Sequence, residues 1–127
     1  MTENDIASLI VDAALKVHRT LGPGLLESVY QATLTYELRN RGLQVREQVA
    51  LPVYNETVKL ELGFRVDLIV DDRVVVEIKS IEALAPVHQK QLLTYLRLMD
   101  LRLGLLINFN VELIRDGIKR VVSRLRE

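Results

Sequence analysis

Apolar side chains recur every three or four positions at the start of the chain, which is the spacing of one face of an α-helix. Residues 4–20 follow this spacing behind Asn4 or Asp5, either of which can cap a helix. The segment LGPG interrupts the pattern. The apolar spacing then resumes over residues 25–41 and stops at Gly42, a residue typical of helix ends. The sequence therefore predicts two successive helices before any strand.

From Leu43 onward, apolar and polar residues alternate, as they do in half-buried β-strands. The alternation covers residues 43–53, and the segment YNET is predicted to turn the chain back. The apolar runs VKLEL, FRVDLIV and VVVEIKS predict three further strands, with DDR as the turn between the last two. Pro86 suits the first turn of a third helix, PVHQKQLLTYLRLMD.

The segment LGLLINF after this helix is almost entirely apolar, which is typical of a strand buried on both faces and often parallel to its neighbours. In VELIRDGIKRVV, the dipeptide Asp116-Gly117 between apolar alternations predicts a tight hairpin. The predicted order is roughly ααββββαβββ, an α/β domain with helices flanking a mixed β-sheet. Since no repeat or linker is visible, residues 1–127 are expected to form a single domain.

The composition narrows the class of protein. A hydrophobic content of 49% is typical of a globular domain, and no apolar run approaches the roughly 20 residues that span a bilayer. The first residues, MTENDIASLI, are too polar for a secretory signal, and the chain has no cysteine for disulfides or thiolate metal sites. We therefore expect a cytoplasmic protein with no membrane association.

Charge is balanced over the chain but unevenly spread. Seventeen basic residues match 17 acidic ones, whereas a protein that coats nucleic acid without sequence preference usually has a basic excess. The C-terminal stretch RDGIKRVVSRLRE is nevertheless basic. Its cations either contact phosphates or form a solvated face; they are Arg115, Lys119, Arg120, Arg124 and Arg126.

Three charged residues interrupt the most apolar strands of the predicted sheet: Asp67, Glu77 and Lys79. Burying an unpaired charge costs several kcal/mol, so a partner is required. Glu77 and Lys79 are two positions apart on one strand and therefore leave it by the same face. The position of Asp67 depends on the turn. A two-residue turn puts Asp67 opposite Val76, whereas a three-residue turn, residues 71–73, puts it opposite Glu77.

In the second register, the Asp67 and Glu77 carboxylates would lie on Cβ atoms about 5 Å apart and would repel each other. A hard divalent cation, Mg²⁺ or Mn²⁺, would turn this repulsion into attraction, with the backbone carbonyl of Ile78 as a further oxygen ligand. Lys79 would then orient water or stabilise charge on a phosphate oxygen. From the residues alone, an Asp–Lys–Glu ion network that serves only the fold is the alternative.

This arrangement resembles the PD-(D/E)xK nuclease superfamily, whose core hairpin carries an Asp followed by Glu-x-Lys. Here these residues are Asp67 and the segment EIK, with Val66 at the position of the motif's proline. The resemblance implies a restriction-endonuclease-like core and a nuclease that needs Mg²⁺ or Mn²⁺, with Asp67, Glu77 and Lys79 as catalytic residues. Asp67, Glu77 and Ile78 would bind the metal.

A second stretch, LGPGLLESVYQATLTYEL, is similar to the signature of the GxxExxY family, which is grouped within that superfamily. Gly24, Glu27 and Tyr30 are its named letters, and the likeness continues through HQKQLLTYLRL and GLLINF. The resemblance implies that Glu27 is catalytic and faces the metal directly or through water. Tyr30 would contact substrate or brace Glu27. From the residues alone, Glu27 could simply complement the helix dipole, and Tyr30 could be a core aromatic.

The third predicted helix contains QLLTY, which matches a Gln-x-x-x-Tyr pattern found in helicase-associated members of the superfamily. Gln91 and Tyr95 are four positions apart and share a helix face. The resemblance implies that they contact nucleic acid or support Lys79. The alternative is an amphipathic helix whose polar edge happens to hold these two side chains.

Taken together, the sequence favours a metal-dependent nuclease that hydrolyses phosphodiester bonds, with DNA preferred to RNA as the substrate. The main alternative is a catalytically silent module that binds nucleic acid or a protein partner and retains the nuclease fold. A homodimer is also considered, because a small body without net charge would need a second copy to surround a duplex. A purely structural homo-oligomer is the third hypothesis.

Overall fold

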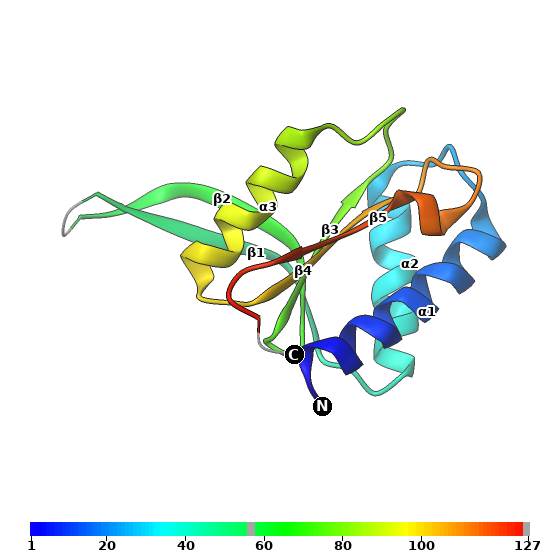
Figure 1. Ribbon diagram of the computed structural model, residues 1–127, viewed down its shortest axis with the longest axis horizontal. Coiled ribbons are helices and arrows are strands. Elements are labelled where there is room, and N and C mark those ends of the chain that lie inside the picture. Colours follow the sequence, from blue (N-terminus) through cyan, green and yellow to red (C-terminus); the bar gives the residue numbers. More distant parts are fainter. Residues whose placement is uncertain (56–57, 126–127) are drawn as a thin grey trace.

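Figure 1 shows a computed structural model of the chain, which describes residues 1–55 and 58–125 and gives no account of the side chains of residues 52–63. Part of the predicted YNET turn and Arg126 of the basic stretch therefore lie outside the described residues. No helix in the described part of the chain is long and apolar enough to cross a membrane.

The first helix, α1 (Glu3–Leu21), is capped by Thr2 rather than by the predicted Asn4 or Asp5. The Thr2 hydroxyl accepts a hydrogen bond from the Asp5 backbone N–H at 3.1 Å, and the Asp5 carboxylate accepts one from the Thr2 N–H at 2.9 Å. Asp5 therefore serves as the third helical residue of a capping box, which places the helix start before Asn4.

The second helix, α2 (Glu27–Asn40), begins two residues later than predicted because Leu26 keeps an extended backbone. It ends as expected before Gly42, whose φ of 83° lies in the left-handed region that glycine adopts without strain. The third helix, α3 (Pro86–Met99), starts at Pro86 as predicted.

Over residues 1–55 and 58–125, a single mixed sheet holds five strands in the order in which they occur along the chain. The strands β1 (Val45–Asn55), β2 (Val58–Val70) and β3 (Val74–Lys79) pair antiparallel in succession. The chain then crosses over through α3, so that β4 (Leu103–Asn108) lies parallel to β3. Strand β5 (Ile118–Val122) returns antiparallel along β4. The predicted α/β class and the buried, parallel character of LGLLINF are both confirmed.

Two details of the predicted order are wrong. The runs VKLEL and FRVDLIV form one long strand, β2, which pairs with β1 on both sides of a register irregularity between Leu51 and Val53. The predicted hairpin at Asp116-Gly117 is instead a short 3₁₀ helix, η1 (Ile114–Gly117). A Cβ atom on Gly117 would overlap the Asn108 carbonyl oxygen, so glycine is needed there for close approach and not for a hairpin turn.

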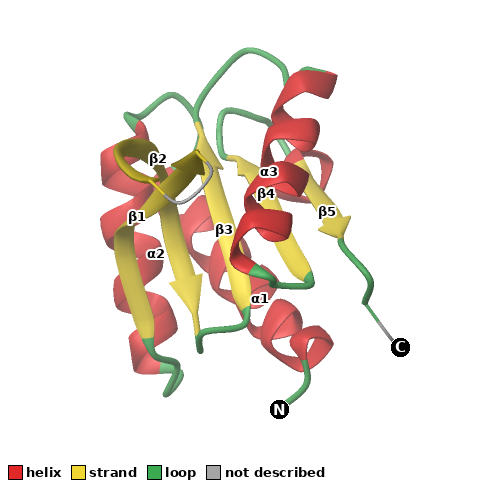
Figure 2. Cartoon of the chain, turned by 90° about the vertical axis from the view of Figure 1, so that its left-hand side faces the viewer, coloured by secondary structure: helices red, strands yellow, loops and turns green. Residues whose placement is uncertain are grey.

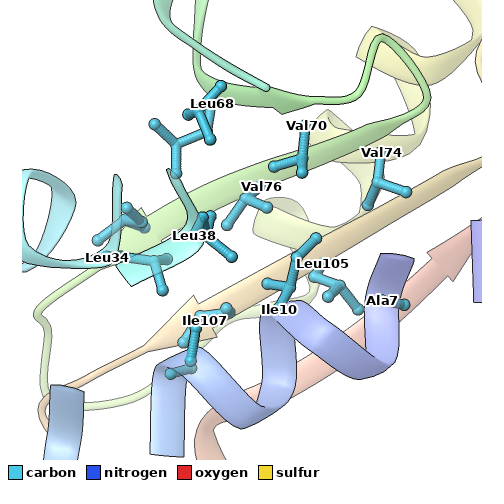
Figure 3. Close-up of a cluster of buried hydrophobic side chains, with 14 of the residues drawn as sticks. Ala7, Ile10, Leu34, Leu38, Leu68, Val70, Val74, Val76, Leu105 and Ile107 are labelled. Atoms are coloured by element: carbon cyan, nitrogen blue, oxygen red, sulfur yellow. The ribbon is translucent and has the colours of Figure 1, made fainter. Parts of the chain in front are cut away.

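The helices cover both faces of the sheet: α1 and α2 lie on one face and α3 on the other (Figure 2). The larger core lies between the sheet and the first two helices (Figure 3), where side chains of all three elements interdigitate. A smaller core lies beneath α3, whose buried Leu92, Tyr95 and Leu96 pack on the opposite face of the sheet. The loop after β4 is tied to α1, because His18 donates from Nε2 to the Val111 carbonyl oxygen at 2.8 Å.

Candidate functional site

The turn between β2 and β3 sets the register of the charged strands. Val70 pairs with Val74, so the turn has three residues, and Leu68 pairs with Val76. The Asp71 carboxylate holds this turn in place, because it accepts a hydrogen bond from the Gln44 N–H at 2.8 Å. The next pair in this register is Asp67 and Glu77. The second of the two predicted registers is therefore the one that the structure adopts.

At this pair, carboxylates replace the backbone partners of the sheet. The Asp67 N–H donates to Glu77 Oε1 at 3.0 Å, and the Ile78 N–H donates to Asp67 Oδ2 at 2.8 Å. Glu77 thus accepts a hydrogen bond from the backbone amide of Asp67. Asp67 in turn accepts one from the amide of Ile78, the residue after Glu77. The regular pairing of β2 with β3 stops at Leu68 and Val76, so the two strands separate where the acids lie.

Strand β1 is also irregular beside Asp67. Gln48 has a φ of 48°, and its side-chain amide donates to Asp67 Oδ1 at 3.1 Å. Val66 and Ile69 both pack in the core beneath α3, although Leu68 between them packs in the opposite core. The strict alternation of strand faces therefore fails at Asp67. This irregularity lets the Asp67 carboxylate lie between strands.

Burial makes the two acids electrostatically unusual. Glu77 is only 9% exposed, and burial raises its pKa to about 8, with the negative charge of Asp67 adding to the shift and Lys79 opposing it. Burial, followed by the charges of Glu77 and Asp67, also raises the pKa of Tyr95, which places this ring near the pair. The Glu77 carboxyl therefore takes up a proton at a higher pH than an ordinary glutamate does when no cation is present.

Lys79 and Glu27 approach the pair from different elements. Lys79 follows Glu77 by two residues on the α3 face of β3, next to Asn108 of β4, and is half-buried. Glu27 begins α2 on the other face of the sheet, and its Oε2 accepts a hydrogen bond from the Ser80 N–H at 3.3 Å. Glu27 therefore lies at the end of β3, one residue beyond Lys79.

The predicted set of three carboxylates is not gathered around one point. Among the residues that the structure describes, no group of three or more Asp, Glu or His side chains lies close enough together to hold a metal ion. Asp67 and Glu77 are brought together with Ile78 beside them, but the Glu27 carboxylate is engaged at the Ser80 amide.

The predicted substrate contact of Tyr30 requires correction. Its side chain is 0% exposed and stacks on Phe109 with ring centroids 4.5 Å apart. The hydroxyl donates to the Gly22 carbonyl oxygen at 2.5 Å and accepts from the Leu25 N–H at 3.1 Å. Tyr30 has no surface left for a substrate. Its hydroxyl instead fixes the loop that leads into Glu27.

Replacing Tyr30 with phenylalanine tests this structural role. We expect the free energy of unfolding to fall by about 1–2 kcal/mol, because the Gly22 carbonyl and the Leu25 amide each lose a part-buried hydrogen bond while the stack on Phe109 remains. Urea denaturation measures the change. Tyr36→Phe, on the exposed side of the same helix, is the matched control and should leave stability unchanged. Unchanged stability of Tyr30→Phe would contradict the assignment.

The two candidate substrate contacts on α3 lie in different surroundings. Tyr95 is 5% exposed, and its ring lies against Phe64 with centroids 5.3 Å apart, so it belongs to the core beneath α3 and borders the acids from that side. Its predicted contact with nucleic acid, or its support of Lys79, stays a prediction. Gln91 is exposed one helical turn earlier, and its contact with nucleic acid stays a prediction.

Two polar residues of the site were missed by sequence reasoning, Gln48 and Asn108. Asn108 is 1% exposed; its Oδ1 accepts from the Ile81 and Asn110 backbone amides, and its Nδ2 donates to the Ile81 carbonyl oxygen. These bonds hold the loop that follows Lys79. A polar residue inside the apolar run LGLLINF was the available signal for Asn108. The signal for Gln48 was weaker, because it occupies an ordinary polar position of an alternating strand.

The donor chemistry fits a hard divalent cation. Mg²⁺ is commonly bound by one or two carboxylates, with waters and substrate oxygens completing its coordination. Asp67 and Glu77 supply two carboxylates, and the Ile78 carbonyl adds another oxygen. A buried, mutually repelling pair of acids with a raised pKa is the electrostatic setting that a cation would relieve.

Comparison with known proteins agrees with this geometry. A family model described as the PD-(D/E)XK nuclease superfamily matches residues 4–121, a range that includes both acids, Lys79 and all of α3. No match was found among curated proteins or among solved structures. The fold and the family match together lead to one conclusion: the chain belongs to the PD-(D/E)XK nuclease superfamily.

Proposed function

We propose that this protein is a metal-dependent nuclease that hydrolyses phosphodiester bonds, acts on DNA in preference to RNA, and belongs to the GxxExxY family within its superfamily. The observation that carries the proposal is the contact between Asp67 and Glu77 on adjacent strands, with Lys79 on the same strand face as Glu77. Superfamily membership supports it from an independent direction.

Each residue has a defined part in the proposed reaction. Asp67, Glu77 and the Ile78 carbonyl would hold Mg²⁺ or Mn²⁺, and the cation would polarise the phosphate and lower the pKa of the attacking water. The Lys79 ammonium stabilises the negative charge that develops on the phosphoryl oxygens. Burial of Glu77 at 9% exposure strengthens these interactions, because charges attract more strongly where water is excluded. Glu27, at the end of β3, would act through a water rather than as a direct ligand.

Cleavage assays with and without cation test the proposal. Purified protein should cleave plasmid DNA or single-stranded DNA with Mg²⁺ or Mn²⁺, cleave RNA more slowly, and lose all cleavage in EDTA. Asp67→Asn should lose cleavage as well, since the amide cannot supply the charge that holds the cation. Equal cleavage in EDTA would refute the metal-dependent chemistry. No cleavage of any of these substrates would refute the nuclease assignment.

One observation favours a second candidate, a catalytically silent module that binds nucleic acid or a protein partner. Both paired acids accept backbone hydrogen bonds, and Glu27 does likewise at Ser80, so each carboxylate already has a structural role. Such a module would bind DNA in EDTA with undiminished affinity and never cleave it. Light scattering on the same sample would show whether a homodimer forms, which a neutral chain would need to surround a duplex.

A further inference from the structure

A chain of side-chain hydrogen bonds joins α2 to Asp67 through Gln48. Gln48 Nε2 donates to Asp67 Oδ1 at 3.1 Å and to Gln31 Oε1 at 2.7 Å. Gln31 Nε2 in turn donates to Glu47 Oε2 at 3.0 Å. Because α2 runs behind β1 and β2 in Figure 2, these bonds reach from the helix through β1 to the strand that carries Asp67. The proposed reaction gives neither glutamine a part.

These bonds fix which way round the Gln48 amide is held. An amide nitrogen carries two hydrogens, and Gln48 uses one on Gln31 and the other on Asp67. Gln31 is itself ordered, because its nitrogen donates to the Glu47 carboxylate and its oxygen accepts from Gln48. A flipped Gln48 amide would turn its oxygen toward the Asp67 carboxylate, which would repel it. The Gln48 nitrogen is therefore held toward Asp67.

The backbone of Gln48 is held in an uncommon conformation. Its φ of 48° lies in the left-handed region, and the Arg65 guanidinium donates to the Gln48 carbonyl oxygen at 3.1 Å. Strand β1 pairs in one register at Glu47 and at Val49, which places Gln48 opposite Asp67. An uncommon backbone conformation that several contacts hold in place is typical of functional sites.

Gln48 orients the Asp67 carboxylate without neutralising it. Each carboxylate oxygen has two lone pairs. Oδ1 uses one to accept from Gln48, and Oδ2 uses one to accept from the Ile78 N–H at 2.8 Å. The second lone pair on each oxygen is where a cation would bind. Because the Gln48 amide is neutral, the negative charge that attracts the cation is kept.

Resting on the metal site of the proposed nuclease, we propose that Gln48 is a positioning residue. It holds the Asp67 carboxylate in the orientation that binds Mg²⁺ or Mn²⁺, and Gln31 holds Gln48. Hydrogen bonds to metal-binding carboxylates set metal affinity, and the loss of one typically costs about 10- to 100-fold. Helix α2 thereby acts on the site at two places, because Glu27 and Gln31 are four residues apart and share a helix face.

Calorimetric titration of Mg²⁺ into the protein, without nucleic acid and at one fixed pH, tests this role. Gln48→Ala should weaken Mg²⁺ binding by about tenfold. Alanine has the same Cβ constraint at a positive φ as glutamine, so the backbone requirement is unchanged. Gln31→Ala should weaken binding by less, because the bond from Gln48 to Asp67 remains. Gln44→Ala is the matched control, since Gln44 is exposed and holds its turn through backbone groups. Its affinity for Mg²⁺ should be unchanged.

Cleavage kinetics on plasmid DNA separate positioning from a purely structural role. For Gln48→Ala, the Mg²⁺ concentration at half-maximal rate should rise about tenfold. The rate at saturating Mg²⁺ should stay within about twofold of the wild type, because Asp67, Glu77 and Lys79 are all still present. A variant that had lost only stability would instead melt at a lower temperature in EDTA and keep the Mg²⁺ dependence of the wild type.

The outcomes separate this inference from the function on which it rests. If Gln48→Ala binds Mg²⁺ as tightly as the wild type, or if Gln44→Ala loses as much affinity, the positioning role is refuted and the nuclease proposal stands. If Gln48→Ala binds Mg²⁺ more weakly and the wild type cleaves no nucleic acid, the positioning role holds and the nuclease proposal fails. If the wild type binds no Mg²⁺, both fail together.

Discussion

Lys79→Ala is expected to lower the rate of DNA cleavage by roughly a hundred- to a thousand-fold, the loss typical of removing one preorganised group that stabilises transition-state charge. The fold should survive, because the Lys79 carbonyl still accepts from the Phe109 N–H at 2.9 Å and the side chain is only half-buried. Initial rates on plasmid DNA with Mn²⁺ measure the first expectation. Thermal denaturation measures the second.

Lys90→Ala is the matched control for this prediction. This substitution also removes a lysine side chain, but from an exposed position of α3. The net charge of the protein therefore falls by the same amount as in Lys79→Ala, while the end of β3 is unchanged. Its cleavage rate should stay within about twofold of the wild type, as expected for an isolated surface charge. A rate for Lys79→Ala as high as that of the control would remove Lys79 from the reaction.

The cation-free protein is expected to become less stable as the pH rises, because of Glu77. Its pKa is about 8 in the folded protein, against 4.5 for an ordinary glutamate, so between these values the folded state holds one more proton than the unfolded chain. This contribution is complete below about pH 4.5 and lost by about pH 8, and at about 1.4 kcal/mol for each unit of pKa it amounts to about 5 kcal/mol. Urea denaturation in EDTA across this range measures it.

Glu77→Gln isolates the effect from the other titrating groups. The amide oxygen can still accept from the Asp67 N–H, but it does not titrate, so the extra fall in stability should vanish. Mg²⁺ at pH 8 should raise the melting temperature of the wild type and leave Glu77→Gln unchanged, since a ligand that binds only the folded state stabilises it. Identical pH profiles of the two proteins in EDTA would contradict the raised pKa.

Much of the architecture could be predicted because apolar spacing reports burial directly. The segments that became α1, α3, β3 and β4 carry unbroken helical or apolar patterns, and each was predicted close to its observed bounds. Asp116-Gly117 was misleading because its turn chemistry is local, whereas the contacts that decide its structure are distant. Gly117 lies against Asn108, and the preceding loop is held by His18 of α1.

The candidate site was predictable as a set of residues but not as an arrangement. Sequence could not choose between two-residue and three-residue turns at Asp71, because the choice rests on a hydrogen bond to Gln44, remote along the chain. Tyr30 carried the same difficulty: a tyrosine beside a conspicuous glutamate suits substrate contact and burial equally. Only the structure decides for burial: the Tyr30 ring stacks on Phe109, and its hydroxyl makes two hydrogen bonds to the backbone.

The hairpin that carries both acids also has a consequence for how the chain folds. Asp67 and Glu77 are ten residues apart along the chain, whereas β3 and β4 can pair only after α3 has crossed the sheet. Contacts close in sequence form sooner than distant ones, so the repelling acids should meet before Asn108 and α2 are in place around them. The raised pKa of Glu77, whose largest cause is burial, would therefore develop only after the hairpin has formed.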